Sequence, residues 1–134
     1  GVTLVSREEL LAQSDFISMH LLLNEDTRKS INADFFKKMK NSAIFVNTAR
    51  GGLVDEDALI EALRTGEIAG AALDVLTEEG IDKDAPLQKF DNVIITPHAA
   101  WYSEQAFYTL LTSAAQEVVR ALHGEPVKNQ VNHF

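Results

Sequence analysis

The sequence predicts an α/β fold in which a parallel β-sheet is covered by helices on both faces. Short apolar runs alternate along the chain with segments of helical periodicity. The runs are apolar throughout instead of alternating with polar residues, which is typical of parallel strands buried on both sides. A length of 134 residues, of which 46% are hydrophobic, is sufficient for the core of one domain.

The first half of the chain is expected to form two helix–strand pairs. Ser6–Glu9 has the S-x-x-E spacing of a capping box, so a short helix should start there. The mostly apolar residues 16–21 form the first predicted strand. A second short helix is predicted over 33–39, where phenylalanines and a methionine recur at helical spacing, and residues 43–47 form the next strand.

The second half continues this alternation. Asp55 is expected to cap a helix that ends before Gly66, the residue type favoured in a left-handed C-terminal cap. Strands are predicted over 69–75 and 93–96, and a long helix over Glu104–His123.

The connection over residues 76–91 does not fit this pattern, because it shows no periodicity. A structureless loop longer than about 12–15 residues inside a compact domain is usually functional or disordered. Since this one joins two predicted strands, we expect it to contribute to a site.

Composition disfavours several classes of partner. The formal net charge of −8 argues against a nucleic-acid or anionic-membrane surface. There is no cysteine, so disulfides and thiolate metal sites are excluded, and the four histidines contain no i, i+4 pair for a metal. No apolar run approaches the roughly 20 residues of a membrane span, so a cytoplasmic protein without membrane contact is expected.

Reactive side chains follow the predicted strands at their carboxyl ends, where open parallel sheets bind ligands. Any one of them would be ordinary at the end of a strand, but together they match the chemistry of a keto acid. An arginine can bind a carboxylate through two hydrogen bonds, and a histidine oriented by a carboxylate can deliver a proton to a carbonyl oxygen as hydride arrives at carbon. The residues are His20, Thr48, Ala49, Arg50, Asp74, Glu78, Glu79, Thr96 and His98.

Three motifs in this region are similar to those of a known family. NTARGGLVDEDAL at 47–59, AGAALDV at 69–75 and TPHAAWYSEQA at 96–106 together resemble the D-isomer-specific 2-hydroxyacid dehydrogenases. The last motif is most similar to the branch that contains the C-terminal-binding-protein corepressors and their bacterial dehydrogenase relatives. The resemblance implies a Rossmann-like doubly wound sheet, NAD or NADP as cofactor, a small 2-keto or D-2-hydroxy acid as substrate, and a homodimer.

The resemblance also implies roles for individual residues. Arg50 corresponds to the arginine that binds the substrate carboxylate, with glycines after it that are expected to let the backbone turn. Glu79 corresponds to the glutamate that pairs with the catalytic histidine, and His98 to that histidine, the acid in reduction and the base in oxidation. Asp74 corresponds to the acceptor for the nicotinamide carboxamide. The full set of expected cofactor contacts is Leu21, Thr27, Thr48, Ala49, Arg50, Asp74, His98 and Trp101.

One part of a dinucleotide site is missing from the sequence. Its seven glycines contain no G-x-G, although the pyrophosphate of NAD is normally bound by a Gly-rich strand–turn–helix. We therefore expect residues 1–123 to be the second half of a cofactor domain, without the Gly-rich first βαβ unit, and 124–134 to be a tail leading toward a substrate domain. On this interpretation the isolated chain is inactive. An alternative keeps the same residues as a dinucleotide sensor in a corepressor-like interaction protein.

Overall fold

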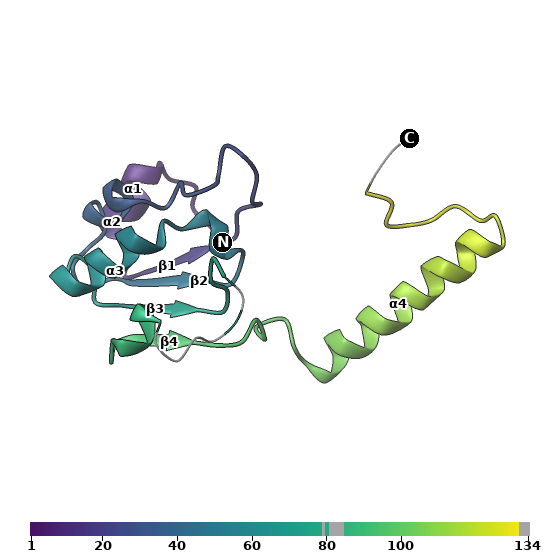
Figure 1. Cartoon of the computed structure of the whole chain (residues 1–134). Helices are drawn as coiled ribbons and strands as arrows, with labels where there is room; N and C mark the ends of the chain where they lie inside the picture. The colour runs from purple at the N-terminus through teal and green to yellow at the C-terminus, as the bar shows by residue number, and fades with distance from the viewer. Residues whose placement is uncertain (79, 81–84, 132–134) are drawn as a thin grey trace. The chain divides into compact units, whose positions relative to one another are not determined.

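The computed structural model describes residues 1–78, 80 and 85–131. The chain divides into two compact units, Gly1–Ala100 and Trp101–Phe134. Figure 1 shows the sheet and its helices in the first unit and a single long helix in the second.

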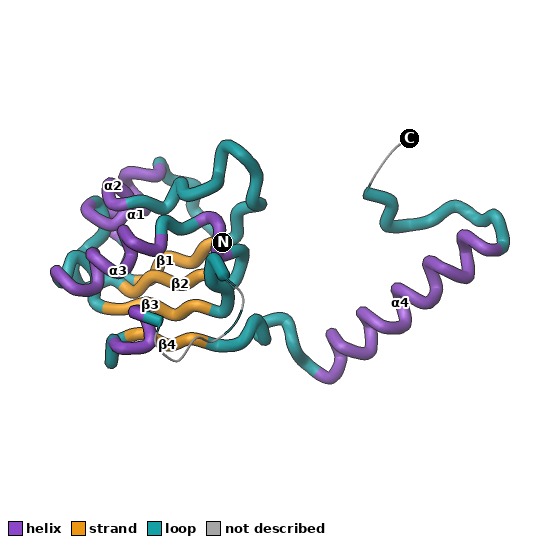
Figure 2. The backbone as a smooth tube through the Cα atoms, viewed as in Figure 1, coloured by secondary structure: helices purple, strands orange, loops and turns teal. Residues whose placement is uncertain are grey.

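The first unit is built on a four-stranded parallel sheet, drawn in orange in Figure 2. All neighbouring strands are parallel, and their order in space is their order along the chain. This confirms the predicted α/β fold, although each strand is shorter than predicted. The strands are β1 (Phe16–Met19), β2 (Ile44–Asn47), β3 (Gly70–Leu73) and β4 (Val93–Ile95).

Helical segments precede the first strand and connect each strand to the next. The predicted helices are confirmed with somewhat different ends, and the connection between β3 and β4 differs from the prediction because it contains a short 3₁₀ helix. That segment, η2, begins at a proline and buries Leu87, which anchors part of the expected structureless loop to the core. The helical segments are α1 (Arg7–Gln13), α2 (Ala33–Lys37), η1 (Gly51–Leu53), α3 (Glu56–Thr65) and η2 (Pro86–Lys89).

Local capping chemistry explains where these helices begin and end. The Ser6 hydroxyl oxygen accepts a hydrogen bond from the Glu9 amide at 3.1 Å, as the capping box predicts. Asp55 precedes α3 as expected but makes no side-chain capping bond, and its carboxylate instead lies 3.8 Å from the Lys29 ammonium. Gly66 ends α3 in the left-handed conformation at φ 72°.

The core of the first unit lies on one face of the sheet. Alternate strand residues, such as Ile17, Phe45 and Leu73, are buried there against the helices. Phe45 also packs edge-to-face with Phe35 and Phe36 of α2, with ring centroids 6.2 and 5.4 Å apart. The residues that point to this face therefore join the sheet and the helices in one hydrophobic cluster.

On the other face of the sheet, large apolar side chains are exposed within the first unit. Phe16 of β1 is 69% exposed and Ile94 of β4 is 67% exposed, and both have the opposite parity to the buried set. The physical reason is that the described helices of this unit contribute their buried side chains to a single cluster on the first face. The described helices of the first unit, taken by itself, therefore cover one face of its sheet.

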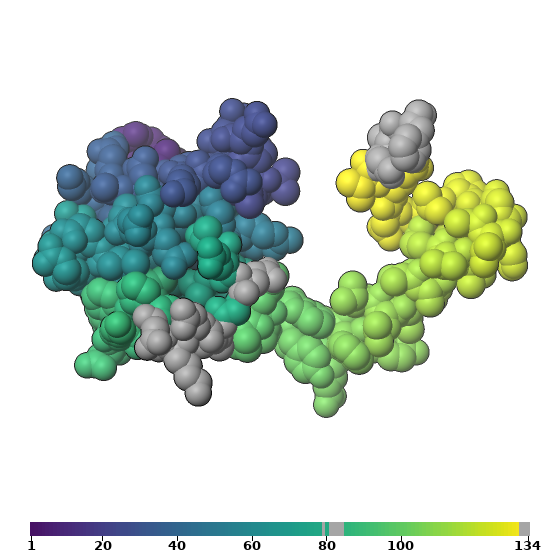
Figure 3. All heavy atoms as spheres, in the orientation of Figure 1, coloured from purple at the N-terminus to yellow at the C-terminus, as the bar shows by residue number. Residues whose placement is uncertain are grey.

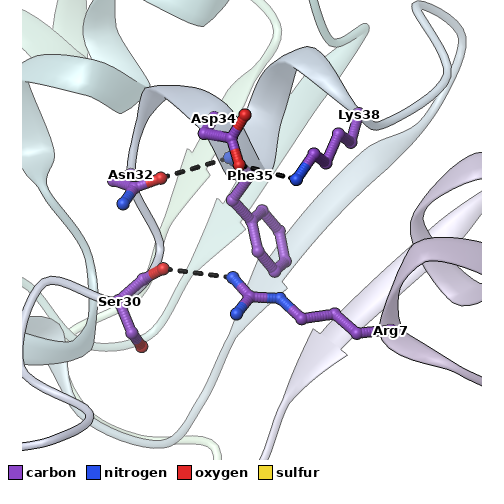
Figure 4. Close-up of polar contacts among 6 residues, drawn as sticks. All are labelled: Arg7, Ser30, Asn32, Asp34, Phe35 and Lys38. Carbon is purple, nitrogen blue, oxygen red and sulfur yellow. Dashed lines mark hydrogen bonds and ion pairs between the residues drawn. The ribbon is translucent and has the colours of Figure 1, made fainter.

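Arg7 of α1 contacts the segment around the start of α2, as Figure 4 shows. Its guanidinium donates to the Ser30 carbonyl oxygen at 3.3 Å and lies 5.3 Å from the centroid of the Phe35 ring. On the same helix, the Lys38 ammonium contacts the Asp34 carboxylate at 2.7 Å, and this hydrogen bond lowers the pKa of Asp34. The contacts of Arg7 thus link α1 to the segment that contains α2, beside the aromatic cluster.

The second unit consists of α4 (Glu104–Leu122) and the segment that follows it. The Ser103 hydroxyl caps the helix by accepting from the Ala106 amide at 3.0 Å, and the predicted long helix is thereby confirmed. After Gly124, at φ 71°, the chain returns along the helix, because the Lys128 amide donates to the Glu117 carboxylate at 2.8 Å. Among the described helices, none has the length and hydropathy needed to span a membrane.

Candidate active site at the carboxyl edge of the sheet

The turn after β2 is held by the side chain of Asn47, which is completely buried. Its amide oxygen accepts from the Ala49 amide, and its amide nitrogen donates to the Arg50 carbonyl oxygen, both at 3.0 Å. The Asn47 carbonyl oxygen also accepts from the Asp74 amide at 2.9 Å, which joins this turn to the end of β3. Asn47 therefore fixes the backbone from which Arg50 projects, while the Arg50 side chain is exposed.

Gly51 allows two loops of the site to come close together. A Cβ atom at this position would lie 1.9 Å from the Leu76 carbonyl oxygen and 2.5 Å from the Thr77 nitrogen, both in the chain that leaves β3. Both glycines lie in η1, the 3₁₀ turn after β2, as the predicted turn requires, but neither has a positive φ that would call for a glycine. For Gly51 the reason is the missing side chain, which leaves room for a neighbouring backbone.

Asp74, at the end of β3, accepts several hydrogen bonds from the chain that follows β4. Its carboxylate is buried and accepts hydrogen bonds from the Thr96 hydroxyl at 2.5 Å, the Ala99 amide at 2.8 Å and the Ala100 amide at 2.9 Å. Burial by itself would raise the pKa of Asp74, but these hydrogen bonds, together with the charge of His98, lower it below its ordinary value. Asp74 is therefore ionised at neutral pH.

His98 follows β4 in an unusual backbone conformation. Its φ of 53° lies in the left-handed region, which a non-glycine residue adopts only when its surroundings hold it there. The His98 amide donates to the Asp74 carbonyl oxygen at 2.9 Å and to the Thr96 carbonyl oxygen at 3.0 Å. The residue lines a hollow of about 230 Å³ together with Asp74 and Glu78.

A second hollow, of about 470 Å³, lies at the ends of β1 and β2. It is lined by Thr48, Ala49 and Arg50 from the turn after β2, and by residues 20–23 after β1. The His20 imidazole Nε2 lies 3.0 Å from the Ser18 hydroxyl. Because neighbouring parallel strands end at the same edge, the two hollows belong to one rim of the sheet.

The loop after β1 stands out from the first unit, in dark blue in Figure 3. Thr27 braces this loop from within: its hydroxyl donates to the Leu22 carbonyl oxygen at 2.6 Å and accepts from the Asn24 amide at 2.9 Å. The Asn24 side chain completes the pair by accepting from the Thr27 amide at 2.9 Å. The hydrogen bonds of Thr27 thus stabilise the loop itself.

The structure brings most of the predicted site residues to this rim. Leu21, Thr48, Ala49 and Arg50 line the larger hollow, and Asp74 and His98 the smaller one. Trp101 belongs to the second unit, where it is 47% exposed and packs edge-to-face on Tyr102 with centroids 5.4 Å apart. Glu79 lies outside the described residues, whereas its neighbour Glu78 lines the smaller hollow.

Sequence reasoning missed the supporting functions of Asn47 and Thr96. Both are polar residues that end an apolar run, and this was the available signal.

A metal site finds no support in the described part of the chain, where no three histidine, aspartate or glutamate side chains are grouped. The rim combines the exposed guanidinium of Arg50, the buried carboxylate of Asp74 and His98, whose backbone has a positive φ.

Comparison with known proteins gives this rim a family context. Residues 1–100 match the family model described as D-isomer specific 2-hydroxyacid dehydrogenase, NAD binding domain. The chain is 43% identical over 125 residues to the glyoxylate/hydroxypyruvate reductase B of Cronobacter sakazakii, covering 93% of this chain and 39% of that protein. It is also 43% identical over 132 residues to the glyoxylate reductase of Korarchaeum cryptofilum, covering 98% of this chain and 40% of that protein.

Solved structures agree with these matches. The D-lactate dehydrogenase of Lactobacillus jensenii, crystallised with NAD⁺, superposes with a TM-score of 0.87 at 34% identity, over 96% of this chain and 43% of that one. The chain thus spans about two fifths of the length of these relatives. Its four parallel strands and alternating helices form a Rossmann-like sheet. The chain belongs to the NAD-binding domain family of the D-isomer-specific 2-hydroxyacid dehydrogenases.

Proposed function

We propose that the protein carrying this chain is an NAD(P)-dependent oxidoreductase that interconverts a small 2-keto acid and the corresponding D-2-hydroxy acid. The observation that carries the proposal is the arrangement of the rim, where Arg50, Asp74 and His98 follow three adjacent parallel strands. The reductase and dehydrogenase names of the relatives favour this function over the sensor alternative.

Arg50 is proposed to bind the substrate carboxylate. Its side chain is exposed at the rim, and only its contact with the Ala49 carbonyl oxygen, at 2.7 Å, is made within the described residues. A guanidinium has further N–H groups that can form two parallel hydrogen bonds to a carboxylate. A 2-keto acid held in this way has its carbonyl group next to the carboxylate, and therefore within the same rim.

His98 is proposed to donate a proton to the carbonyl oxygen during reduction and to remove it in the reverse direction. A histidine suits this task because its ordinary pKa lies near neutral pH. The backbone of His98 is fixed at the edge of the smaller hollow, which supports the assignment, since a general acid must be held in a defined position relative to its substrate. Glu79 is proposed to orient the imidazole by accepting its second N–H.

The residues of this rim fit the nicotinamide end of the cofactor. Within the described contacts, one lone pair of Asp74 Oδ2 stays available after the bond from the Ala100 amide, and a primary carboxamide has an N–H to donate to it. Thr48, Ala49 and Leu21 are proposed to line the space beside the ring. When bound, the cofactor supplies or accepts the hydride. The sequence contains no G-x-G turn for the pyrophosphate, so this chain's own residues account for the nicotinamide side only.

The experiment is a steady-state assay of the full-length protein with NADH or NADPH and glyoxylate, hydroxypyruvate or pyruvate. His98→Gln should lower kcat by about 10²–10⁴-fold, since general acid catalysis contributes that much. Arg50→Gln should lower kcat/KM by about 10–100-fold, mainly through KM, because charged hydrogen bonds to the substrate are lost. Arg64→Gln is the matched control, because Arg64 pairs with Glu61 on the surface of α3 and should leave both constants unchanged.

The assay also distinguishes the alternatives. Oxidation of D-lactate but not L-lactate would agree with the proposed stereochemistry. Wild-type turnover in His98→Gln would refute the assignment of the proton donor. Tight NADH binding without turnover of any 2-keto acid would favour the sensor.

A further inference from the structure

We propose that Thr96 is a positioning residue, which acts with Asp74 as a clamp on the backbone that carries His98. The inference rests on the proposed function, because it concerns the orientation of the proposed proton donor. It assigns a second task to Asp74, beside its proposed contact with the cofactor. The clamp is defined as Asp74, the Thr96 hydroxyl and the amides of residues 98–100.

The clamp joins the backbone amides of one short turn to a single residue. Three consecutive amides, those of His98, Ala99 and Ala100, donate to Asp74 at 2.9, 2.8 and 2.9 Å. The first bonds to the Asp74 carbonyl oxygen and the other two to its carboxylate. The end of β4 is thereby tied to the end of β3, over a sequence separation of 24–26 residues.

Thr96 contributes the one side-chain donor of this clamp. Its hydroxyl donates to Asp74 Oδ1 at 2.5 Å, on the same oxygen that accepts from the Ala99 amide. Its own amide donates to the Leu73 carbonyl oxygen at 2.9 Å, so Thr96 is also held by the last bond of the sheet. The threonine therefore fixes the carboxylate relative to β4, and the carboxylate fixes the amides that follow.

The left-handed backbone of His98 shows why such a clamp is needed. A residue with a Cβ rarely adopts φ near 53° by itself, so the surrounding hydrogen bonds must hold it. The Asp74 carboxylate accepts hydrogen bonds from residues on both sides of His98. The donors are the Thr96 hydroxyl before it and the Ala99 and Ala100 amides after it. Without the Thr96 hydroxyl, only the amides of Ala99 and Ala100 would hold the carboxylate within the described residues, so its tie to β4 is lost and the turn is loosened.

The test compares Thr96→Val, which keeps the side-chain shape and removes the donor, with Thr96→Ser, which keeps the donor. In the full-length protein, with NADH and glyoxylate, Thr96→Val should lower kcat by about 10–100-fold, as expected for a misplaced reacting group. The KM for glyoxylate should change less than about threefold, because Arg50 is untouched, and Thr96→Ser should recover most of kcat. Thr65→Val is the matched control, since its hydroxyl donates to the Glu61 carbonyl oxygen of the same helix, α3, at 2.8 Å, far from the clamp in sequence.

Hydrogen exchange supplies the readout that a general loss of stability would not reproduce. In Thr96→Val, a peptide covering residues 97–100 should exchange faster, while peptides from β2 and α3 keep their wild-type rates. Wild-type kcat in Thr96→Val, an unchanged exchange rate over 97–100, or a failure of Thr96→Ser to recover activity would each overturn the inference. If His98→Gln is inactive while Thr96→Val is normal, the clamp is refuted and the proposed function stands. If His98→Gln is fully active, the proposed function fails and the inference fails with it.

Discussion

Replacing Gly51 with alanine is expected to destabilise the protein, although its φ is not positive and would accept an alanine. An alanine at a compatible glycine position normally stabilises by about 0.4–1 kcal/mol, because it restricts the unfolded chain. At Gly51, however, the new Cβ would lie 1.9 Å from the Leu76 carbonyl oxygen, and real Cβ contacts are essentially never shorter than 3.0 Å. The two loops would have to separate by at least about 1.1 Å.

The cost of that separation can be estimated from overpacked cores, where such strain typically amounts to about 1–3 kcal/mol. We expect a loss of about this size in the free energy of unfolding, measured by urea denaturation of the full-length protein with circular dichroism. The same displacement shifts the chain leaving β3 relative to Arg50. Since a misplacement of about 1 Å can cost about 10²-fold, kcat/KM should fall as well.

Gly52 provides the matched control because it is the next residue of η1. A Cβ there would meet the end of the Leu23 side chain at 3.0 Å, and a flexible side chain can move aside. Gly52→Ala should therefore change stability by less than about 1 kcal/mol, in line with an unstrained glycine replacement. If Gly51→Ala is as stable as the wild type, or if Gly52→Ala is equally destabilised, the close approach of the two loops does not require a glycine.

Three further predictions concern hydrogen bonds of the first unit. Asn47→Ala should lower the free energy of unfolding by about 1–3 kcal/mol, because the buried backbone groups of the turn lose their hydrogen-bond partner. Asn41→Ala, at an exposed residue, should lower it less. Equal losses of unfolding free energy for the two variants in urea denaturation would contradict this prediction. The lowered pKa of Asp74 stabilises the fold above the pKa of an unfolded aspartate, about 3.9, and this contribution is lost as the pH falls through the lowered folded value. Asp74→Asn should therefore flatten the acid side of a stability–pH curve, whereas Asp26→Asn should reproduce the wild-type curve. Ser6→Ala should cost about 1 kcal/mol through loss of the cap on α1, and a melting temperature equal to that of the wild type would refute it.

Much of the candidate site could be predicted because the rule for parallel sheets acts on local patterns. Once the apolar runs are recognised as parallel strands, Arg50 and His98 must lie at the same edge. The tasks of Asn47 and Thr96 could not be predicted in this way. A polar residue at the end of a strand can face solvent, a ligand or a neighbouring loop, and only the folded chain shows which of these it contacts.

The sequence by itself determined the alternation of helices and strands, the caps at Ser6 and Gly66 and the residue types at the rim. These features depend on interactions within a few residues, or on the periodicity of one segment. The tertiary structure decided that Gly51 faces the backbone of Leu76 and that the amides after β4 converge on Asp74. It also decided that the described helices of the first unit cover one face of the sheet and not both. The physical reason is that these contacts join segments about 25 residues apart, whose approach depends on how the whole sheet packs.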